Sequence, residues 1–503
     1  MLRATCSGDP LAGEHRKTIG TMPANNSGTN SESFCARAAL VLCLGATLPL
    51  VCGAQAVPSQ ALGQSSGPTA QSFQGSVVQG EASAQPIDLS LDDAMQRGLR
   101  NNLGIILNGT QLAGARGQRL SDLQALLPEV DFKAQESVAE VDLAAQGLRI
   151  PGIPTIIGPF GYTDLRGSVS WSLVDVPSLR NYLAARHNFT AAQLSLQDAR
   201  DLVVLTVGNA YLLVLADEAR VSSIQAQVAT SKISLDQAVA NHQAGTAPLL
   251  DELRARVDYQ SLEQQLIAAQ NGLEKDKLSL ARTIGLPLAQ KFNLTDTAPY
   301  AVFDLIDIDK AIHDAHANRK DLAAMVEQTK ALEDQRKSKT DERLPKVAFA
   351  GDYGDIGVNV RHSHGTGNAQ GTLSAPLFEE FGLRGEAQIA QAQLDTDKAQ
   401  LSDLNAQVDA DVRDALLDIA SAQKQVEVSR SSVDLANEAL SEAQQRYANG
   451  VSDNLAVSQA EQSLAQANDQ YVASLYRHNI AKLSLARSLG AAQNYRNYLQ
   501  RSQ

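Results

Sequence analysis

The block KLSLAR occurs twice in this chain, at residues 277–282 and again at residues 482–487, 205 positions later. Around it, residues 197–285 align with residues 402–490 at the same offset without a gap. The matched positions keep the type of side chain, as in Val203 with Val408, Gly245 with Gly450 and Gly285 with Gly490. One structural unit therefore occurs twice in the chain.

A second alignment pairs residues 92–132 with residues 309–349, at an offset of 217. The first copy thus carries about 12 extra residues between its two aligned blocks. Each copy is about 200 residues long, which exceeds the repeat length of solenoid proteins and predicts two similar halves in one body. We assign residues 87–300 to the first repeat, 301–490 to the second and 491–503 to a C-terminal tail.

The N-terminal region differs in composition from the rest. Residues 38–51 form the one strong apolar run, Arg37 precedes it, and small residues at 54–56 offer a cleavage site, so residues 1–56 are predicted to be a secretory signal peptide. Met22 is an alternative start, and lipidation of Cys52 is an alternative that lacks the expected small residue before the cysteine. Residues 57–86, rich in Ser, Gln and Gly, are predicted to be a disordered leader.

Charge and motif content exclude several functions. The formal net charge of −13 makes nucleic acid an improbable partner. All four cysteines precede residue 53, so the remainder cannot form thiolate metal sites. Neither a Ser-His-Asp arrangement, a phosphate-binding glycine loop nor an HExxH motif is visible. We therefore expect no enzyme activity, no cofactor and no metal site.

The longest segments are predicted to be helices. Residues 177–243 and 380–448 lack interior proline, and at 1.5 Å per residue a helix of about 65 residues spans about 100 Å. A seven-residue apolar period predicts left-handed supercoiling against neighbours. Glycines follow both helices, and return helices are expected at 248–284 and 453–489, so that each copy contains a helical hairpin.

Two further helices are expected at residues 88–125 and 304–343, each ending before Leu-Pro. Between the helices the apolar period changes to two. Four strands of about ten residues are predicted at 130–138, 166–175, 346–355 and 368–377. Their expected lipid-facing side chains are Val169, Trp171, Leu173, Val347 and Phe349.

Strands of this length cross a bilayer when tilted. However, four strands cannot close a barrel, and open sheet edges are not tolerated in lipid. Several chains must therefore contribute to one barrel. The predicted fold class is mainly α with a small β part.

The two glycine turns carry the signatures HQAG..PLLDELRA, from His242, and RYANGVSDNLAVSQAE, from Arg446, followed by LARTIG and LARSLG. Together with the duplication, these resemble the TolC family of outer-membrane efflux and secretion channels. The resemblance implies a homotrimer with a shared 12-stranded transmembrane β-barrel and a trimeric α-barrel of coiled-coil hairpins that extends into the periplasm. It also implies a passive, gated conduit of a tripartite efflux or type I secretion system, served by a periplasmic adaptor and an inner-membrane transporter.

The resemblance places the glycine turns at the periplasmic tip, where the channel closes. The expected tip residues are His242, Gly245, Asp251, Tyr447, Gly450 and Asp453. The family's best-known pattern has acidic residues six and nine positions after the second glycine, where this chain has Ala456 and Gln459. Asp251 and Asp453 could supply a displaced ring of carboxylates.

An alternative class is a periplasmic coiled-coil adaptor or scaffold, because adaptors also present long helical hairpins. An adaptor would normally carry a small β-rich, lipoyl-like domain beside one hairpin. This chain instead has two hairpins and alternating strands of about ten residues.

Overall fold

The computed structural model describes residues 70–499 except positions 146, 150, 297–299, 305 and 453. The chain divides into two compact units, 1–65 and 66–503, and every described residue belongs to the second. The predicted signal peptide and Asp453 lie outside the described residues.

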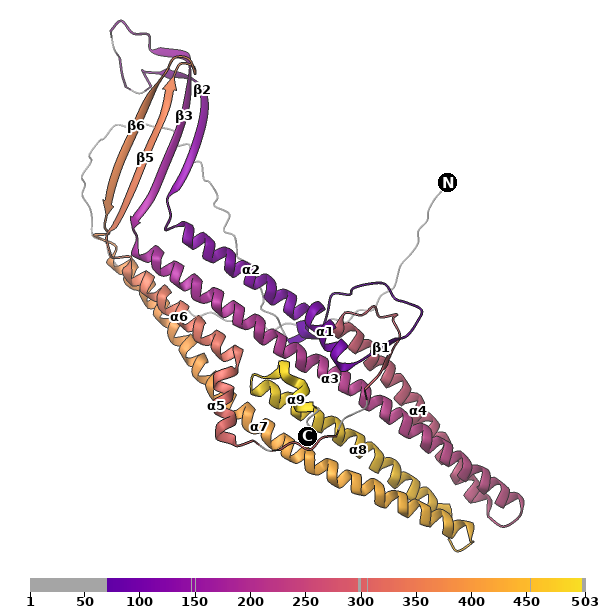
Figure 1. The fold of residues 1–503 in the computed structure, drawn as a ribbon. Coiled ribbons are helices and arrows are strands. Elements are labelled where there is room, and N and C mark those ends of the chain that lie inside the picture. The colour runs from indigo at the N-terminus through magenta and orange to yellow at the C-terminus, as the bar shows by residue number, and fades with distance from the viewer. Residues whose placement is uncertain are drawn as a thin grey trace, which may run out of the picture. The chain divides into compact units, whose positions relative to one another are not determined.

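The two copies repeat one order of elements, namely a helix pair, a strand pair and a long helical hairpin (Figure 1). The first copy comprises α1 (Leu91–Asn101), α2 (Leu103–Gln124), β2 (Glu129–Asp142), β3 (Ile156–Val174), α3 (Val176–Gln243) and α4 (Leu249–Ile284). The second comprises α5 (Ile308–Asn318), α6 (Lys320–Asp341), β5 (Lys346–Gly357), β6 (Ser363–Ser374), α7 (Glu380–Ala448) and α8 (Asn454–Ser488).

The expected helices over 88–125 and 304–343 are each broken into two. Asn102 (ψ 131°) and Arg319 (ψ 124°) adopt extended backbone between the two pieces, and they are equivalent at the 217-residue offset. The side chain of Asn102 accepts a hydrogen bond from the backbone N–H of Gly104 at 2.9 Å, which starts a new helix. Capping by a single polar residue leaves the apolar period almost unchanged, so the sequence pattern did not reveal the break.

The described strands form a four-stranded antiparallel sheet in the order β2-β3-β5-β6. The strand β3 begins at Ile156, ten residues before the predicted start, and β6 ends at Ser374, before the predicted end. Pairing of β3 with β5 stops at Thr163, whereas pairing with β2 continues to Ile156. The β2-β3 ribbon therefore extends seven residues beyond the end of β5-β6.

Residues 70–86 are not a disordered leader. The short 3-10 helix η1 (Ala70–Gln74) buries Phe73, the N–H of Val77 donates to the carbonyl of Asn101 at 2.9 Å, and Gln79 donates to Gly285 at 3.1 Å. Next, β1 (Ile87–Leu89) pairs in parallel with β4 (Phe292–Leu294). Isolated hydrogen bonds and one aromatic side chain attach this segment to the rest of the protein. Contacts of this kind produce no periodic apolar pattern in the sequence.

The core lies where α3 meets the helices around it. Val203, Val207 and Tyr211 of α3 are at most 1% exposed and pack with residues of α1, α4 and α8. By length and composition α3 could cross a membrane, but these side chains are buried inside the protein. A second core around Val408 and Ile419 joins α5, α7 and α8. The C-terminal tail adds η2 (Ala492–Asn494) and α9 (Tyr495–Leu499) to the first core.

We expect Gly208→Val to destabilise the protein by about 1–3 kcal/mol, because a Cβ at Gly208 would lie 2.6 Å from Cδ1 of Leu483 and 3.1 Å from Cε of Met95. Gly114→Val is the matched control, since a Cβ there meets nothing within 4 Å. Its effect should stay within about 0.5 kcal/mol. Thermal unfolding followed by circular dichroism measures both, and equal destabilisation would contradict close packing of α3 on α8.

Candidate functional site

Both long helices end in the same hydrogen-bonded turn. Thr246 donates its N–H to the carbonyl of Asn241, and Val451 donates to Arg446, each at 2.9 Å and five residues back. This pattern is a Schellman motif and requires a left-handed residue, which Gly245 (φ 72°) and Gly450 (φ 69°) supply. No atom lies within 4 Å of a Cβ built at either glycine, so only the backbone angle requires glycine there.

The structure brings the expected tip residues of the two copies close together. The amide of Asn241, next to His242, donates to the hydroxyl of Tyr447 at 3.5 Å. The ring of His242 itself contacts the carbonyl of Ala247 at 3.2 Å, within its own turn. The two turns are thus joined across the copies by Tyr447, while His242 stabilises one turn locally.

Asp251 is buried, and its carbonyl accepts a hydrogen bond from the buried amide of Asn454 at 3.5 Å. The nearest cation is Arg254, 3.9 Å away from its carboxylate. Of the two positions that depart from the family pattern, Gln459 is exposed and Ala456 is half-buried. The backbone of Asp251 is therefore joined to the second copy, while its carboxylate contacts Arg254 on the same helix.

Further from the turns, the same interface continues as a polar seam. Ser458 of α8 donates to the carboxylate of Asp258 on α4, and Ser234 of α3 donates to Glu461 of α8 at 2.7 Å. A cavity of about 750 Å³ lies between the helices of both hairpins here, lined mostly by serine, threonine and amide side chains, with Asp258 and Glu461 in its wall. We call the pairs Asn241–Tyr447, Asp251–Asn454, Asp258–Ser458 and Ser234–Glu461 the polar seam.

Burial raises the pKa of Glu461, and the nearby charge of Asp258 raises it further, whereas the hydrogen bond from Ser234 lowers it. A carboxyl group whose folded pKa exceeds its unfolded value favours folding when protonated. The stabilising contribution of protonated Glu461 is fully present at pH values below the pKa that the carboxyl has in the unfolded chain. It is lost as the pH rises through the pKa of the folded protein. We therefore expect the polar seam to be more stable in mild acid than at neutral pH.

Sequence reasoning found the turns but not the seam. Asn454, Ser458 and Glu461 occupy one face of α8 at spacings of four and three, which is the spacing of a helical contact face. Because these residues are polar, they do not contribute to the apolar period of α8. Their helical spacing is the only feature of the sequence that indicates a contact face.

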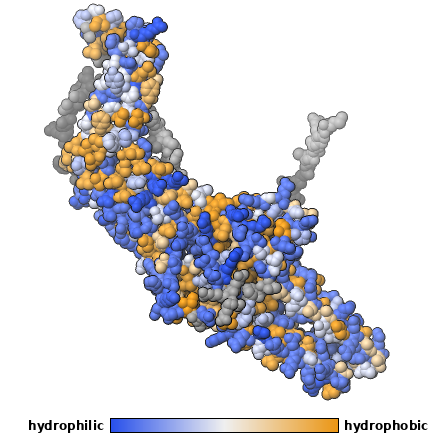
Figure 2. All heavy atoms as spheres, in the orientation of Figure 1, coloured by the Kyte–Doolittle hydropathy of each residue, from blue (hydrophilic) through white to orange (hydrophobic). Residues whose placement is uncertain are grey.

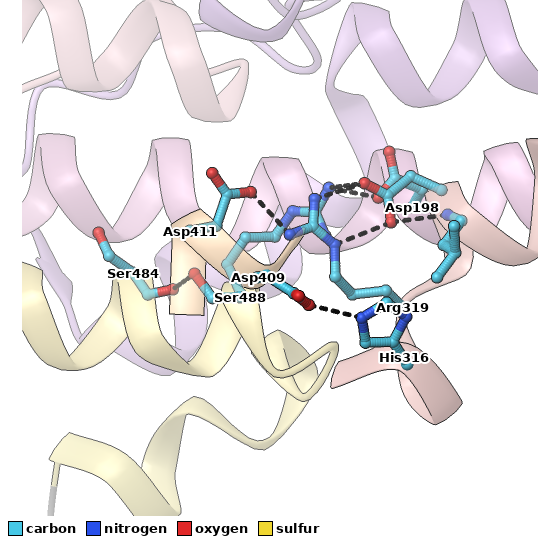
Figure 3. Close-up of polar contacts among 10 residues, drawn as sticks. Asp198, His316, Arg319, Asp409, Asp411, Ser484 and Ser488 are labelled. Atoms are coloured by element: carbon cyan, nitrogen blue, oxygen red, sulfur yellow. Dashed lines mark hydrogen bonds and ion pairs between the residues drawn. The ribbon is translucent and has the colours of Figure 1, made fainter. Parts of the chain in front are cut away.

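A second group of charges joins α3, α6, α7 and α8 near the break between α5 and α6 (Figure 3). Arg319, buried at the break, binds Asp321 and Asp411 at 2.7 Å each, and His316 lies 2.7 Å from Asp409. Asp409 and Asp411 of α7 thus bind His316 of α5 and Arg319 at the break. This group fixes the angle at which α5 and α6 meet α7.

Four of the strand residues predicted to face lipid, namely Val169, Trp171, Val347 and Phe349, lie in register on one face of the sheet. Val169 is opposite Val130 and Gly351, Trp171 is opposite Phe349, and Val347 is opposite Leu373. The indole N–H of Trp171 donates to the carbonyl of Leu126 at 3.1 Å. After Ser172 the pairing shifts by one residue, so Val174 rather than Leu173 is opposite Val347.

The opposite face of the sheet is polar. Arg166 pairs there with Asp164 and Asp352 and donates to Thr366 at 3.2 Å, which links three strands. Figure 2 shows a hydrophobic area where the strands meet the helices. Its exposed residues include Leu373, Leu377, Phe378 and Phe381. The sheet thus has one apolar and one polar face, with aromatic residues at its helical end.

A family model described as outer membrane efflux protein matches residues 110–286 and 311–491. The pyoverdine export outer membrane protein OpmQ of Pseudomonas putida is 25% identical over 313 residues, a match that covers 61% of this chain and 66% of OpmQ, just under two thirds. The toluene efflux pump outer membrane protein TtgC of Pseudomonas putida is 21% identical over 413 residues, covering 80% of this chain and 83% of TtgC.

Solved channel structures share the fold. The outer membrane protein VceC of Vibrio cholerae superimposes with a TM-score of 0.71 at 19% identity, covering 80% of this chain and 96% of VceC. The CmeC outer membrane channel of Campylobacter jejuni gives a TM-score of 0.71 at 17% identity, covering 84% of this chain and 92% of CmeC.

Glu461→Gln should tighten the polar seam at pH 7.5, because the amide keeps the bond from Ser234 but carries no charge to be buried. We expect the amides of residues 457–469 to exchange with solvent roughly two- to fivefold more slowly than in the wild type at the same pH. Glu438→Gln, on the exposed face of α7, is the matched control and should leave exchange unchanged. Faster exchange in Glu461→Gln would show that the ionised carboxylate stabilises the seam.

Proposed function

We infer the role of this chain from its family: it belongs to the outer membrane efflux protein family, whose members are channel proteins rather than enzymes. It is accordingly an outer-membrane channel protein whose helices extend into the periplasm. Both copies of the repeat match the family model, so a periplasmic adaptor or scaffold is not the better description. We propose that the chain carries out no catalysis and acts as a passive, gated exit conduit.

One observation carries the proposal most directly, namely a sheet with an apolar face, a polar face and two open edges. Among the described strands, β2 and β6 are each paired on one side only. An open edge leaves backbone groups unpaired, and in lipid each unpaired group costs several kcal/mol. Three copies joined edge to edge give a closed barrel of 12 strands, with the apolar face toward lipid and Arg166 toward the lumen.

The helical hairpins would continue the conduit across the periplasm and close it at the glycine turns. We propose Gly245, Gly450, Tyr447, His242 and Asp251 as tip residues, together with Asp453. The polar seam supports this role, because a typical hydrogen bond contributes only about 0.5–1.5 kcal/mol, less than the burial of a large apolar side chain. Separation of the hairpins at the seam would open the tip.

A passive conduit has no energy source of its own, so it needs partner proteins that drive transport. We propose an inner-membrane transporter that supplies cargo and a periplasmic adaptor that joins it to the tip. The relatives are named for pyoverdine export and for toluene and antibiotic efflux. These names favour small organic molecules as cargo, and hence an efflux system over type I secretion of proteins.

The conduit is tested by native mass in detergent and by conductance in a planar bilayer. We expect a mass of three chains and discrete channel steps. Tyr447→Ala should raise the conductance by removing the ring and hydroxyl that join the turns. Tyr447→Phe is the matched control, since it removes only the 3.5 Å bond from Asn241 and should have a smaller effect. A monomeric mass would contradict the conduit, and an unchanged conductance in Tyr447→Ala would contradict the latch.

The orientation of the sheet predicts a difference between adjacent residues. Val169→Cys, on the apolar face, should react with lipid-soluble maleimides and poorly with charged ones, because lipid would cover it. Ser168→Cys, on the opposite face beside Asp352, should react with charged reagents from the lumen. Equal labelling of Val169→Cys by both reagents would contradict a lipid-facing position.

A further inference from the structure

The identical block KLSLAR lies in two different environments. In the second copy, Leu483 is 2% exposed and packs on Gly208 of α3, and Arg487 binds Asp198 of α3 at 2.5 Å. In the first copy, the equivalent Leu278 is 47% exposed, and Arg282 is exposed. Leu280 and Ala281 of the first block are buried like their equivalents, so the difference between the two copies lies on the face that carries Leu278 and Arg282.

The duplication predicts which residue type and position should pair with Arg282. The equivalent of Asp198 at the 205-residue offset is Asp403, which lies exposed on α7. Within the described part of the chain, neither Arg282 nor Asp403 takes part in an ion pair. The chain therefore carries one arginine and one aspartate that are equivalent to a partly buried ion pair and are both exposed.

Exposed apolar residues follow the same two helices. On α4 these are Leu249, Leu250, Leu253, Val257, Ile267 and Leu278, and on α7 they are Phe381, Ile389, Leu417, Val428 and Leu435. At about 100° per residue, the first set falls within about 100° around its helix and the second within about 80°. Each set is a single stripe, which is the pattern of a helix that packs against another helix.

The stripes correspond to a seam that the chain already forms internally. Leu212 of α3 and Val472 of α8 line one small cavity, and their equivalents are Leu417 and Ile267, each 68% exposed. Thr230 of α3 and Gln462 of α8 line the cavity between the hairpins, and their equivalents are Leu435 and Val257. The residues of α3 and α8 at this contact thus have counterparts on α7 and α4 in which one apolar pair is kept and one polar pair is replaced by an apolar pair.

We propose that α4 of one copy packs antiparallel against α7 of a second copy of this chain, with Arg282 bound to Asp403 of the partner subunit and Val257 beside Leu435 of the partner subunit. This proposal rests on the proposed trimer and adds the residues that join its helices. Around the ring, the internal contact of α3 with α8 then alternates with an equivalent contact between chains. Opposite charges and matching apolar stripes both favour a second copy as the occupant.

Cysteine cross-linking tests the register directly. In Val257→Cys/Leu435→Cys, mild oxidation should link copies into dimers and trimers on non-reducing gels. Each single variant should give no such ladder, which also controls for the four cysteines before residue 53. Val257→Cys/Leu417→Cys is the matched control, because its second site lies 18 residues, or about 27 Å, along α7. Equal cross-linking in this control, or a link within one chain, would overturn the proposed register.

Charge reversal tests the ion pair. Arg282→Glu and Asp403→Arg should each lower the detergent concentration at which the oligomer dissociates, and the double variant should restore most of the loss. Circular dichroism confirms that each variant folds. If three copies assemble and conduct but neither the cross-link nor the rescue is seen, this inference is wrong while the proposed function stands. If the native mass is that of one chain, the proposed function fails first.

Discussion

The arrangement of the helices depends on α8, which packs on both halves of the chain. Leu483 belongs to the core that α3 forms with α1 and α4, whereas Leu485 belongs to the core around α7. Residues two apart on a helix point to nearly opposite sides, so opposite faces of α8 contribute to the two cores. Burial of a leucine contributes about 1.5–3 kcal/mol, and the partly buried ion pair Arg487–Asp198 adds a directional contact beside it.

The character of this contact changes along α8. Around residue 483 it is apolar, and toward Asn454 it becomes the polar seam of hydroxyl, amide and carboxylate groups. The two hairpins are therefore joined firmly at one end and more weakly at the other. A molecule built in this way can move at its glycine turns while its cores remain intact, which is what a gate at one end of a rigid tube requires.

Much of this fold could be predicted from the sequence, because long periodic segments carry strong signals. The bounds of α7 agree with the expected 380–448, and α3 begins one residue before its expected start. The breaks at Asn102 and Arg319 and the packing of residues 70–86 could not be predicted, since single caps and isolated backbone bonds leave no period. The glycine turns of the candidate site were found because left-handed turns favour glycine, whereas Asn454 and Glu461 are polar and resemble a solvated face.

The unequal strand lengths also have a consequence for the outer mouth of the channel. The β2-β3 ribbon continues seven residues past the last pair of β3 with β5, which is roughly 20 Å of strand. In a three-fold ring, three tall ribbons would alternate with three low turns. The rim would then be notched, so that molecules leaving the pore could spread sideways close to the cell surface.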